Sequence, residues 1–326
     1  LYLSVDISIG LIIHQTKVTY YKTLDMSVKI SEKLKYDPWE AQQEITDLKI
    51  VVHCCRYWML SEWECENMSF PFWRIYHSHT GGSYVSFDGR EVELSPSKLI
   101  MIPPYTSFST RIKGGVSHQN ESIKGLKISD IQEIDIHKKS GLCDQFFVHF
   151  NLDYLFDKIK CDIYEIELTD YWQNEIKIIE QDRLANPNSI NFQSNIKITG
   201  CILYALQRLD TSVWAVNTID NRILKAIKYI ETNLSTELSN KHLSSIANLA
   251  TNSFARLFRE SLQCSVQQYI QKKRIDAAII LLHYSDIEID NIASKCGYCD
   301  RSHFSKAFKK TTGAAPASYR KKVRAF

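Results

Sequence analysis

One short pattern occurs twice in the last third of the chain, at a spacing of 50 residues. The first copy runs from Leu243 to Ile270 and the second from Ile289 to Arg320. Three aromatic residues and one basic residue recur, in the pairs Phe254 and Phe304, Phe258 and Phe308, Tyr269 and Tyr319, and Arg256 and Lys306. Repetition at a fixed spacing indicates one supersecondary unit used twice. Each copy predicts a short helix, a tight turn and a basic amphipathic helix, which is the pattern of a helix-turn-helix.

The residues at the two turns support this prediction. Gly297 stands at the turn of the second copy, where a glycine can adopt a positive φ without penalty. Asn248 stands at the equivalent place in the first copy, and asparagine is the non-glycine residue that best tolerates that conformation. Ser239 is a plausible N-cap for the first helix, and a longer helix from about Val266 to His283 would join the two copies.

The charge of the chain is unevenly distributed. Residues 219–326 contain 18 Lys and Arg against 9 Asp and Glu, a net charge of +9. The remainder contains 22 against 28, a net charge of −6. A basic end on a mildly acidic body, in the same segment as the repeat, indicates a nucleic-acid-binding domain.

The second helix of each copy has a buried and an exposed face. The predicted buried residues are Phe254, Leu257 and Phe258, and Phe304, Ala307 and Phe308. The exposed residues suited to hydrogen bonding with DNA base edges are Thr251, Asn252, Ser253 and Arg256, and Arg301, Ser302, His303 and Lys306. Those further along each helix, which are better placed for phosphates, are Arg259, Lys309, Lys310 and Thr311.

The second copy and the segment before it, with the sequences KKRIDAAIILL, IDNIASKCGY and DRSHFSKAFKKTTGAAPASYR, resemble the AraC/XylS family of bacterial transcription regulators. The resemblance covers about a third of the chain. It implies two helix-turn-helix units held by one connecting helix, with recognition helices in successive major grooves about one turn (~10 bp) apart. It also implies double-stranded DNA and RNA polymerase as partners, and activation more often than repression.

Two positions depart from the family pattern. Gln263 stands where a glycine usually follows the first recognition helix, and Ala315 replaces the usual Ser or Thr cap before Pro316. Pro316 still suits the first position of a helix. Neither change removes a DNA-facing group, so we expect an effect on local stability and none on function.

Residues 50–168 predict a chain of short strands. RIYHSH, SYVSF, REVEL, KLIMI and FFVHF are alternating or apolar runs, separated by turns at Gly81-Gly82, Asp88-Gly89, Pro103-Pro104 and Gly114-Gly115. Closely spaced short strands favour an antiparallel barrel or jelly roll. This stretch resembles the cupin-type sensor that precedes such DNA-binding domains. The resemblance implies a small-molecule effector bound in the barrel.

Five residues are candidates for effector binding: Trp73, Arg74, Tyr76, His77 and His79. The aromatic residues between Tyr57 and Tyr76 would suit a carbohydrate, although core packing is their commoner role. His77 and His79 lie on one face of a strand and invite a metal interpretation. Ser83 and Phe108 stand where further ligands would be expected, so we predict no metal and no cofactor.

Apolar residues recur at helical spacing after Asp170, with a break at Asn186-Pro187-Asn188. The predicted fold class is therefore α+β, with an N-terminal cupin-like antiparallel β-barrel, flanking helices and a C-terminal all-α domain of two helix-turn-helix units. The predicted segments are 1–35 without assignment, 36–168 as barrel, 169–218 as helical dimerisation region and linker, and 219–326 as DNA-binding domain.

Several classes of protein are disfavoured. Nine cysteines without disulfide-framework spacing fit a reducing cytoplasm, and no apolar run predicts a membrane span. Cys296 and Cys299 form a C-x-x-C pattern without a second ligand pair, which favours a structural role. Nucleotide-binding and hydrolase motifs are absent, so we predict no enzyme activity.

We therefore predict a cytoplasmic, homodimeric, effector-responsive DNA-binding regulator, and the family resemblance favours an activator. Two alternatives are a metal-dependent cupin enzyme with a DNA-binding tail and a constitutive DNA binder without an effector. The first requires metal at His77 and His79. The second requires that no ligand stabilises the barrel.

Overall fold

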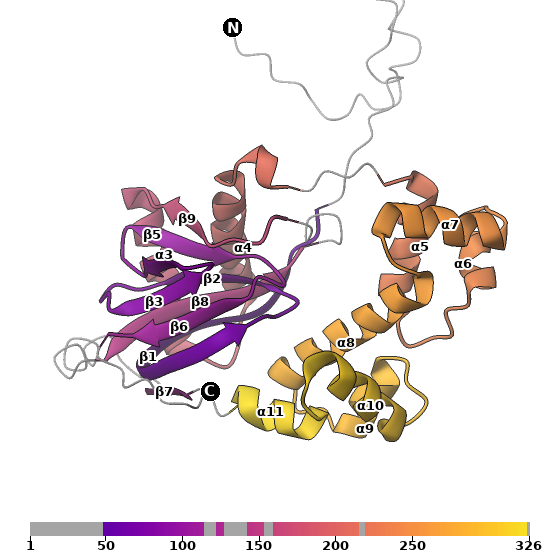
Figure 1. Cartoon of the computed structure of the whole chain (residues 1–326). Helices are drawn as coiled ribbons and strands as arrows, with labels where there is room; N and C mark the ends of the chain where they lie inside the picture. Colours follow the sequence, from indigo (N-terminus) through magenta and orange to yellow (C-terminus); the bar gives the residue numbers. More distant parts are fainter. Residues whose placement is uncertain (1–47, 114–121, 127–141, 153–158, 215–218, 325–326) are drawn as a thin grey trace, which may run out of the picture. The chain divides into compact units, whose positions relative to one another are not determined.

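The computed structural model describes residues 48–113, 122–126, 142–152, 159–214 and 219–324 (Figure 1). The predicted N-terminal segment 1–35 and the Gly114-Gly115 turn lie outside these residues. Residues 48–326 form one compact unit, in which an antiparallel sheet comes first and a set of helices follows.

The sheet has nine strands. They are β1 (Val51–Met68), β2 (Trp73–His77), β3 (Ser83–Phe87), β4 (Arg90–Glu93), β5 (Lys98–Ile102), β6 (Phe108–Ile112), β7 (Ser122–Leu126), β8 (Cys143–Asn151) and β9 (Tyr164–Glu167). The strand order is β4-β3-β6-β1-β8-β2-β5-β9, and β7 pairs with β1. The five apolar runs identified in the sequence all overlap strands, but His79, expected on the same strand face as His77, lies beyond the end of β2. The predicted Asp88-Gly89 turn is the two-residue loop between β3 and β4. Both of its residues have positive φ, as a hairpin turn of this length requires.

The long strand β1 gives the sheet its curvature. Its first part pairs with β8, while its later part pairs with β7 and then with β6. The register shifts between Val52 and Cys54, between Leu60 and Glu62, and between Cys65 and Met68. Irregularities of this kind bend a strand and increase its twist. One strand can therefore belong to both sides of a half-barrel, as the cupin-like prediction requires.

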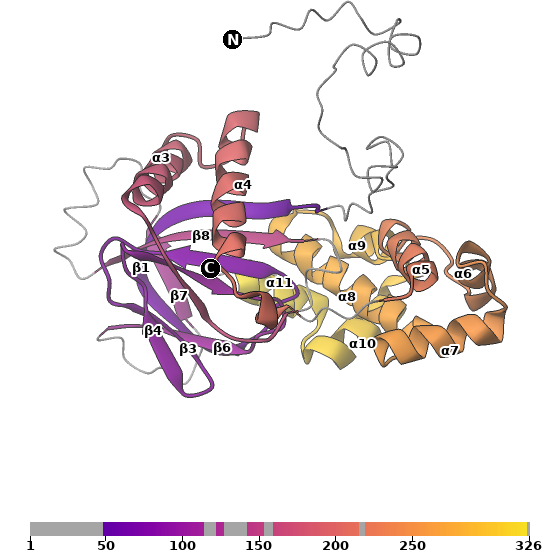
Figure 2. The same cartoon turned by 90° about the horizontal axis from the view of Figure 1, so that it is seen from above.

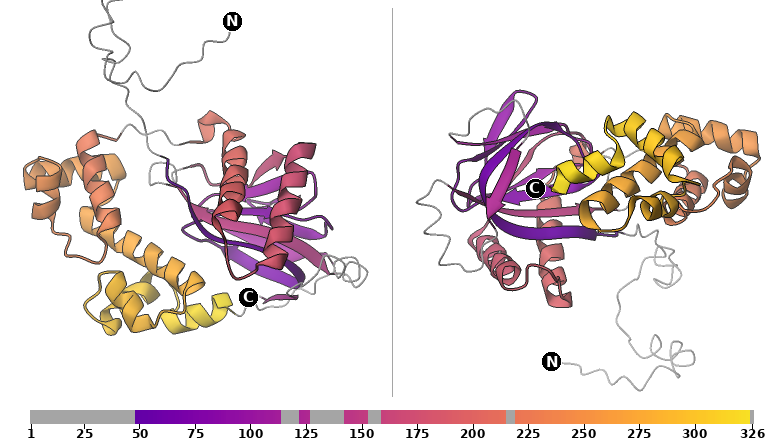
Figure 3. Two further views of the ribbon diagram at one scale, coloured as in Figure 1. Left: turned by 180° about the vertical axis from the view of Figure 1, so that it is seen from behind. Right: turned by 90° about the horizontal axis from the view of Figure 1, so that it is seen from below.

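Strand alternation sends neighbouring side chains to opposite faces of this sheet. In β2, Trp73 and Ile75 join the apolar cluster that includes residues of α3 (Asp170–Ala185) and α4 (Phe192–Gln207). Tyr76 joins a second cluster with Leu60, Val85 and other residues of the opposite, concave face. Figure 2 and the left view of Figure 3 show α3 and α4 on the same side of the sheet.

The predicted break between these two helices is confirmed, since α3 ends at Ala185 and α4 begins at Phe192. Ile198 and Ile202 of α4 are fully buried against the sheet. Ile196, which follows the same apolar pattern, is instead 56% exposed, and Phe192 one turn before it is 79% exposed. The outer face of α4 is therefore partly apolar.

The C-terminal part is helical. Its helices are α5 (Asn221–Thr232), α6 (Asn240–Ile246), α7 (Thr251–Leu262), α8 (Val266–Tyr284), α9 (Ile289–Lys295), α10 (Arg301–Thr312) and α11 (Pro316–Arg324). Ser239 caps α6 as predicted, with its side chain accepting from the backbone N–H of His242. The predicted α+β fold class with a C-terminal all-α domain is confirmed. The exact boundaries at residues 168 and 218 stay predictions. None of the helices in the described part of the chain is long and apolar enough to cross a bilayer.

Candidate nucleic-acid interface

The two repeat units have nearly identical turns. In the first, the backbone N–H of Leu249 donates to Ser244 at 2.9 Å, and in the second that of Tyr298 donates to Ala293 at 2.9 Å. The turn residues Asn248 and Gly297 have φ values of 51° and 76°. Both therefore adopt the left-handed conformation that their residue types favour.

The turns differ in length by one residue, because Asn248 and Gly297 are 49 apart whereas the helices that follow begin 50 apart. The additional residue lets Asp300 cap α10, and its side chain accepts from the backbone N–H of His303 at 2.7 Å. The matching N-cap of α7 is Ala250, which makes no side-chain capping bond. The first recognition helix is therefore the less well capped of the two.

The repeated aromatic residues build two equivalent cores. Phe254 and Phe258 are fully buried with ring centroids 5.6 Å apart, and Phe304 and Phe308 are fully buried with centroids 5.5 Å apart. Each pair meets the tyrosine from the following helix edge to face, at interplanar angles of 75° and 79°. Leu257, which was also predicted to be buried, is only partly so. The aromatic residues that recur in the sequence therefore pack in the same way in both units.

All residues predicted to contact DNA are exposed on α7 and α10. The base-reading set is Thr251, Asn252, Ser253, Arg256, Arg301, Ser302, His303 and Lys306, and the phosphate set is Arg259, Lys309, Lys310 and Thr311. Their contacts with DNA remain predictions. The structure adds a partner that the sequence did not indicate: Asp290 of α9 pairs with Arg301 at 3.2 Å, and both side chains are more than half exposed. Such surface pairs contribute little stability, so the Arg301 guanidinium can leave Asp290 at little cost.

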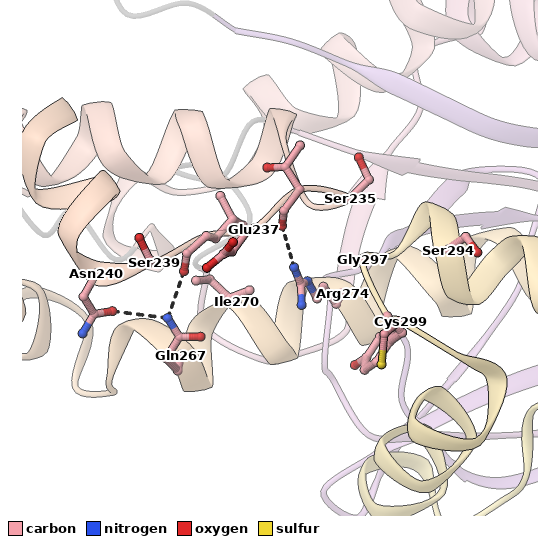
Figure 4. Close-up of a pocket in the computed structure, with 13 residues that line it drawn as sticks. Ser235, Glu237, Ser239, Asn240, Gln267, Ile270, Arg274, Ser294, Gly297 and Cys299 are labelled. Atoms are coloured by element: carbon pink, nitrogen blue, oxygen red, sulfur yellow. Dashed lines mark hydrogen bonds between the residues drawn. The ribbon is translucent and has the colours of Figure 1, made fainter.

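The two units are held together by α8 and by the close approach of Gly297 to Arg274 (Figure 4). Arg274 of α8 donates from Nε to the carbonyl of Leu234 and from Nη2 to that of Thr236, at 3.0 and 2.9 Å. A Cβ on Gly297 would overlap the Leu234 carbonyl oxygen and the Arg274 guanidinium. Gly297 is therefore required for its φ and also for this approach. The contact restricts the spacing between the two recognition helices.

A cavity of about 500 Å³ opens on the concave face of the sheet. Its polar lining includes Arg74, Tyr76, Gln145 and His149, and its apolar lining includes aromatic residues such as Trp58 and Phe147. Arg74 donates from Nη1 to the Tyr76 hydroxyl at 2.7 Å and lies over the Phe70 ring. Arg74 Nε, Gln145 Nε2 and His149 Nε2 are buried and have no hydrogen-bond partner among the described residues. Unsatisfied buried polar atoms of this kind are expected where a ligand binds.

His149 also connects this cavity to the helical part. Its Nδ1 lies 2.6 Å from the hydroxyl of Tyr284, the last residue of α8. Burial, followed by the nearby Arg74 charge, holds the pKa of His149 well below its usual value, so the imidazole is neutral. With Tyr284 as donor, the proton of His149 is on Nε2. Arg74 Nε and Gln145 Nε2 are hydrogen-bond donors in either case, whereas His149 Nε2 is a donor in this tautomer and an acceptor in the other.

The five predicted effector residues fall on two faces. Arg74 and Tyr76 line the cavity, whereas Trp73 packs on Phe150 in the opposite core. His77 and His79 approach Glu180 of α3, with His79 Nε2 at 2.7 Å from Glu180 Oε2. Burial opposes protonation of His79, but the hydrogen bond and charge of Glu180 raise its pKa overall.

Gln145, His149 and Glu180 were not identified from the sequence. The alternation of FFVHF could have marked His149 as a partner of Arg74, since the two are paired residues of β8 and β2. Glu180 gave no comparable signal, because it lies 101 residues from His79 on a different kind of element.

The repeated segment is similar in sequence to a family of helix-turn-helix domains and to known regulatory proteins. A helix-turn-helix domain family matches residues 243–322. The probable transcriptional regulator LumQ of Photobacterium leiognathi is 35% identical over 91 residues, 28% of this chain and 37% of that protein. The arabinose operon regulatory protein of Escherichia coli K12 is 34% identical over 105 residues, 31% of this chain and 35% of that protein. The match thus spans about a third of the length of these relatives.

Two solved structures are also similar. The DNA-binding domain of AdpA, in complex with a target DNA, is 25% identical, covers 32% of this chain and 94% of that one, and has a TM-score of 0.31. ToxT from Vibrio cholerae is 11% identical, covers 86% of this chain and 97% of that one, and has a TM-score of 0.46.

Proposed function

We propose that the chain is a sequence-specific DNA-binding transcription regulator controlled by a small molecule, since residues 243–322 match a helix-turn-helix domain family and resemble transcription regulators. The observation that supports it best is the pair of equivalent helices α7 and α10, which expose hydrogen-bonding side chains in a basic domain. A connecting helix and a close contact between the units give these helices a defined separation. Such an arrangement suits two successive major grooves of one duplex.

The chemistry of the cavity suggests the class of effector. Two unpartnered donors, Arg74 Nε and Gln145 Nε2, belong to residues that line the cavity, and the rest of the lining is mostly aromatic and aliphatic with two further cations, Arg56 and Lys124. Donors of this kind are best satisfied by a carboxylate or another acceptor-rich group. We therefore propose an effector with an anionic head and an apolar body. The alternative of a neutral carbohydrate is less well matched, because it would leave the Arg74 charge without a counter-ion.

An effector bound in the cavity can influence the DNA-binding units through α8. This helix carries both units, and its last residue, Tyr284, lines the cavity and contacts His149. A ligand that takes a hydrogen bond from His149 or displaces Tyr284 changes the interactions at the end of α8. The size of the response in DNA binding would depend on how much more tightly the ligand binds one arrangement of α8 than the other.

We also propose that the chain is a cytoplasmic homodimer, assembled through α3 and α4, that activates transcription by recruiting or positioning RNA polymerase. The exposed apolar side chains of Phe192 and Ile196 support the dimer surface. The cupin-enzyme alternative is not favoured, because His77 and His79 face α3 and do not line the cavity.

The experiment that tests the proposal is selection of bound duplexes from a random DNA library by the full-length protein at near-physiological salt. We expect two short enriched blocks about 10 bp apart, one for each recognition helix. Arg301→Ala should weaken the base preference in one enriched block, and Arg256→Ala should weaken it in the other. Binding without any enriched sequence, with or without anionic amphipathic compounds, would contradict sequence-specific regulation.

A further inference from the structure

His77, His79 and Glu180 form a compact cluster outside the effector cavity. His77 is the last residue of β2, and Glu180 lies on the buried side of α3. His77 Nδ1 is 3.4 Å from Glu180 Oε1, and His79 Nε2 is 2.7 Å from Glu180 Oε2. One ligand atom from each residue lies within 4.8 Å of the other two. The side chain of His77 is fully buried, that of Glu180 is 6% exposed and that of His79 is 18% exposed.

Two buried polar atoms of this cluster lack a hydrogen-bond partner. Among the described residues, neither His77 Nδ1 nor Glu180 Oε1 has a hydrogen-bond partner. The other ring nitrogen of His77, Nε2, lies 3.4 Å from the carbonyl oxygen of Pro96, which can only accept a hydrogen bond. Both ring nitrogens of His77 thus lie 3.4 Å from an oxygen acceptor, and a neutral imidazole carries only one proton, so one nitrogen lone pair faces an oxygen. Two acceptors facing each other in a dry site are unfavourable unless a proton or a metal cation lies between them.

The surroundings hold the cluster in place independently of any ion. Asp144 accepts from the backbone N–H of His79 at 2.9 Å and from that of Thr80 at 2.7 Å, and it also accepts from the hydroxyls of Ser78 and Tyr57. These bonds fix the turn that carries His79. The Pro96 carbonyl orients His77 in the manner usual for a metal-bound histidine, whose second ring nitrogen donates to a carbonyl or carboxylate.

We propose that His77, His79 and Glu180 bind one divalent transition-metal ion of the zinc class, which fastens α3 to the sheet. Two imidazole nitrogens and one carboxylate oxygen are a donor set that Zn²⁺ accepts, with water as a fourth ligand. Admitting the ion requires the His79–Glu180 hydrogen bond to open, so that each atom reaches a bond length of about 2.0–2.2 Å. The partial exposure of His79 supplies the route of entry. The expectation of no metal from the sequence rested on the lack of a third ligand, and Glu180 supplies it.

The test uses the full-length protein, stripped with a chelator and then titrated with Zn²⁺ against a chromophoric competitor. We expect one site per chain that is weakened at least about 100-fold in Glu180→Gln and in His79→Gln, since even outer-shell changes cost 10–100-fold. The matched control is Glu175→Gln, which removes the same charge from α3 but lies outside the cluster. It should bind Zn²⁺ as the unaltered protein does. All variants keep the nine cysteines, so thiol binding is common to all of them.

Co²⁺ gives an independent readout of the ligand type. Four-coordinate Co²⁺ at this site should show visible d–d absorption without the near-ultraviolet charge-transfer band of thiolate ligands, and Glu180→Gln should lose that absorption. Circular dichroism of the metal-free variants checks that they fold. If Glu180→Gln does not fold, His79→Gln provides the same test of the site. Equal Zn²⁺ affinity in the unaltered protein and both variants, or no binding at all, would overturn the proposal. The three groups would then share protons only.

Discussion

Gln263 and Gly313 end the two recognition helices in the same left-handed conformation, with φ values of 57° and 79°. Each donates its backbone N–H to the carbonyl of the residue four positions earlier, Arg259 or Lys309. A glycine adopts this conformation without steric cost, whereas an L-residue with a Cβ does not. The first unit therefore carries a conformational penalty that the second unit avoids.

Replacing Gln263 by glycine should stabilise the helical domain by about 0.5–1 kcal/mol, because relief of the left-handed strain outweighs the added freedom of the unfolded chain. The variant also loses an exposed hydrogen bond from Gln263 Nε2 to Glu260, which limits the gain. Denaturant unfolding followed by circular dichroism measures the change. Gly313→Ala is the matched control and should destabilise by about 1 kcal/mol. A Cβ at Gly313 would meet no atom within 4 Å, so that cost is conformational alone.

A second asymmetry concerns helix caps. Ser265 forms a full capping box with Gln268 at the start of α8. Ala315 occupies the equivalent position before α11, where its carbonyl accepts from the N–H of Tyr319 at 2.8 Å. Ala315→Ser should stabilise the protein by about 1 kcal/mol by supplying the missing acceptor. Ser265→Ala should destabilise it by a similar amount. Opposite shifts in the unfolding midpoint are expected, and a lower midpoint for Ala315→Ser would show that α11 begins differently.

Arg301 and Lys309 should affect DNA binding in different ways. On the selected site, Arg301→Ala should cost about 1–3 kcal/mol and relax the base preference at one position. Lys309→Ala should weaken binding to all DNA sequences alike. It should also reduce by about one the slope of log affinity against log salt concentration. Fluorescence anisotropy at several salt concentrations separates the two effects. Intact affinity and base preference in Arg301→Ala would exclude that residue from base reading.

Asp290 provides a further control on the same contact. Because Asp290 pairs with Arg301 in the protein alone, Asp290→Asn releases the guanidinium and removes a negative charge from the DNA-facing side. We expect a several-fold gain in DNA affinity, given the small energy of an exposed pair. The gain should disappear when Arg301 is also replaced by alanine. A gain that persists in the double variant would come from net charge and not from release of Arg301.

Tyr284 should couple the cavity to DNA binding. Tyr284→Phe removes the hydroxyl that contacts His149 and keeps the ring that stacks on His53. We expect the variant to bind DNA with an affinity that no longer depends on the effector. Its affinity for the effector should change as well, since coupling is reciprocal. Anisotropy titrations with and without the effector measure this, and an unchanged response would place the coupling elsewhere.

The dimer proposal depends on the outer face of α4. Ile196→Glu places a charge on an apolar surface that is 56% exposed, so it should disrupt self-association without disturbing the fold. Light scattering coupled to size-exclusion chromatography should show a dimer for the unaltered protein and a monomer for the variant. Lys113→Glu, at an exposed position just after β6 and outside α3 and α4, is a control for charge alone. Equal masses for the unaltered protein and Ile196→Glu would reject this surface.

Much of the helical domain could be predicted from the sequence because its information is local. Helical periodicity in the α8 sequence selects six residues as core-facing, and all six are buried: Tyr269, Ile270, Ile275, Ala278, Ile279 and Leu282. The positive φ values of Asn248 and Gly297 were likewise predictable from residue type. The strand β1 was not predicted, because a strand that pairs with three partners in turn has no single alternation of burial.

By itself, the sequence determined the repeat, its turns, its two aromatic cores and the exposed faces of the recognition helices. These features depend on residues within one or two turns of each other, so a period and a residue type suffice to predict them. Only the tertiary structure decided which β2 side chains face the cavity and which face α3. It alone brought Gln145 and His149 to Arg74, and Glu180 to His77 and His79, because strand pairing and helix packing join residues that are far apart in the chain.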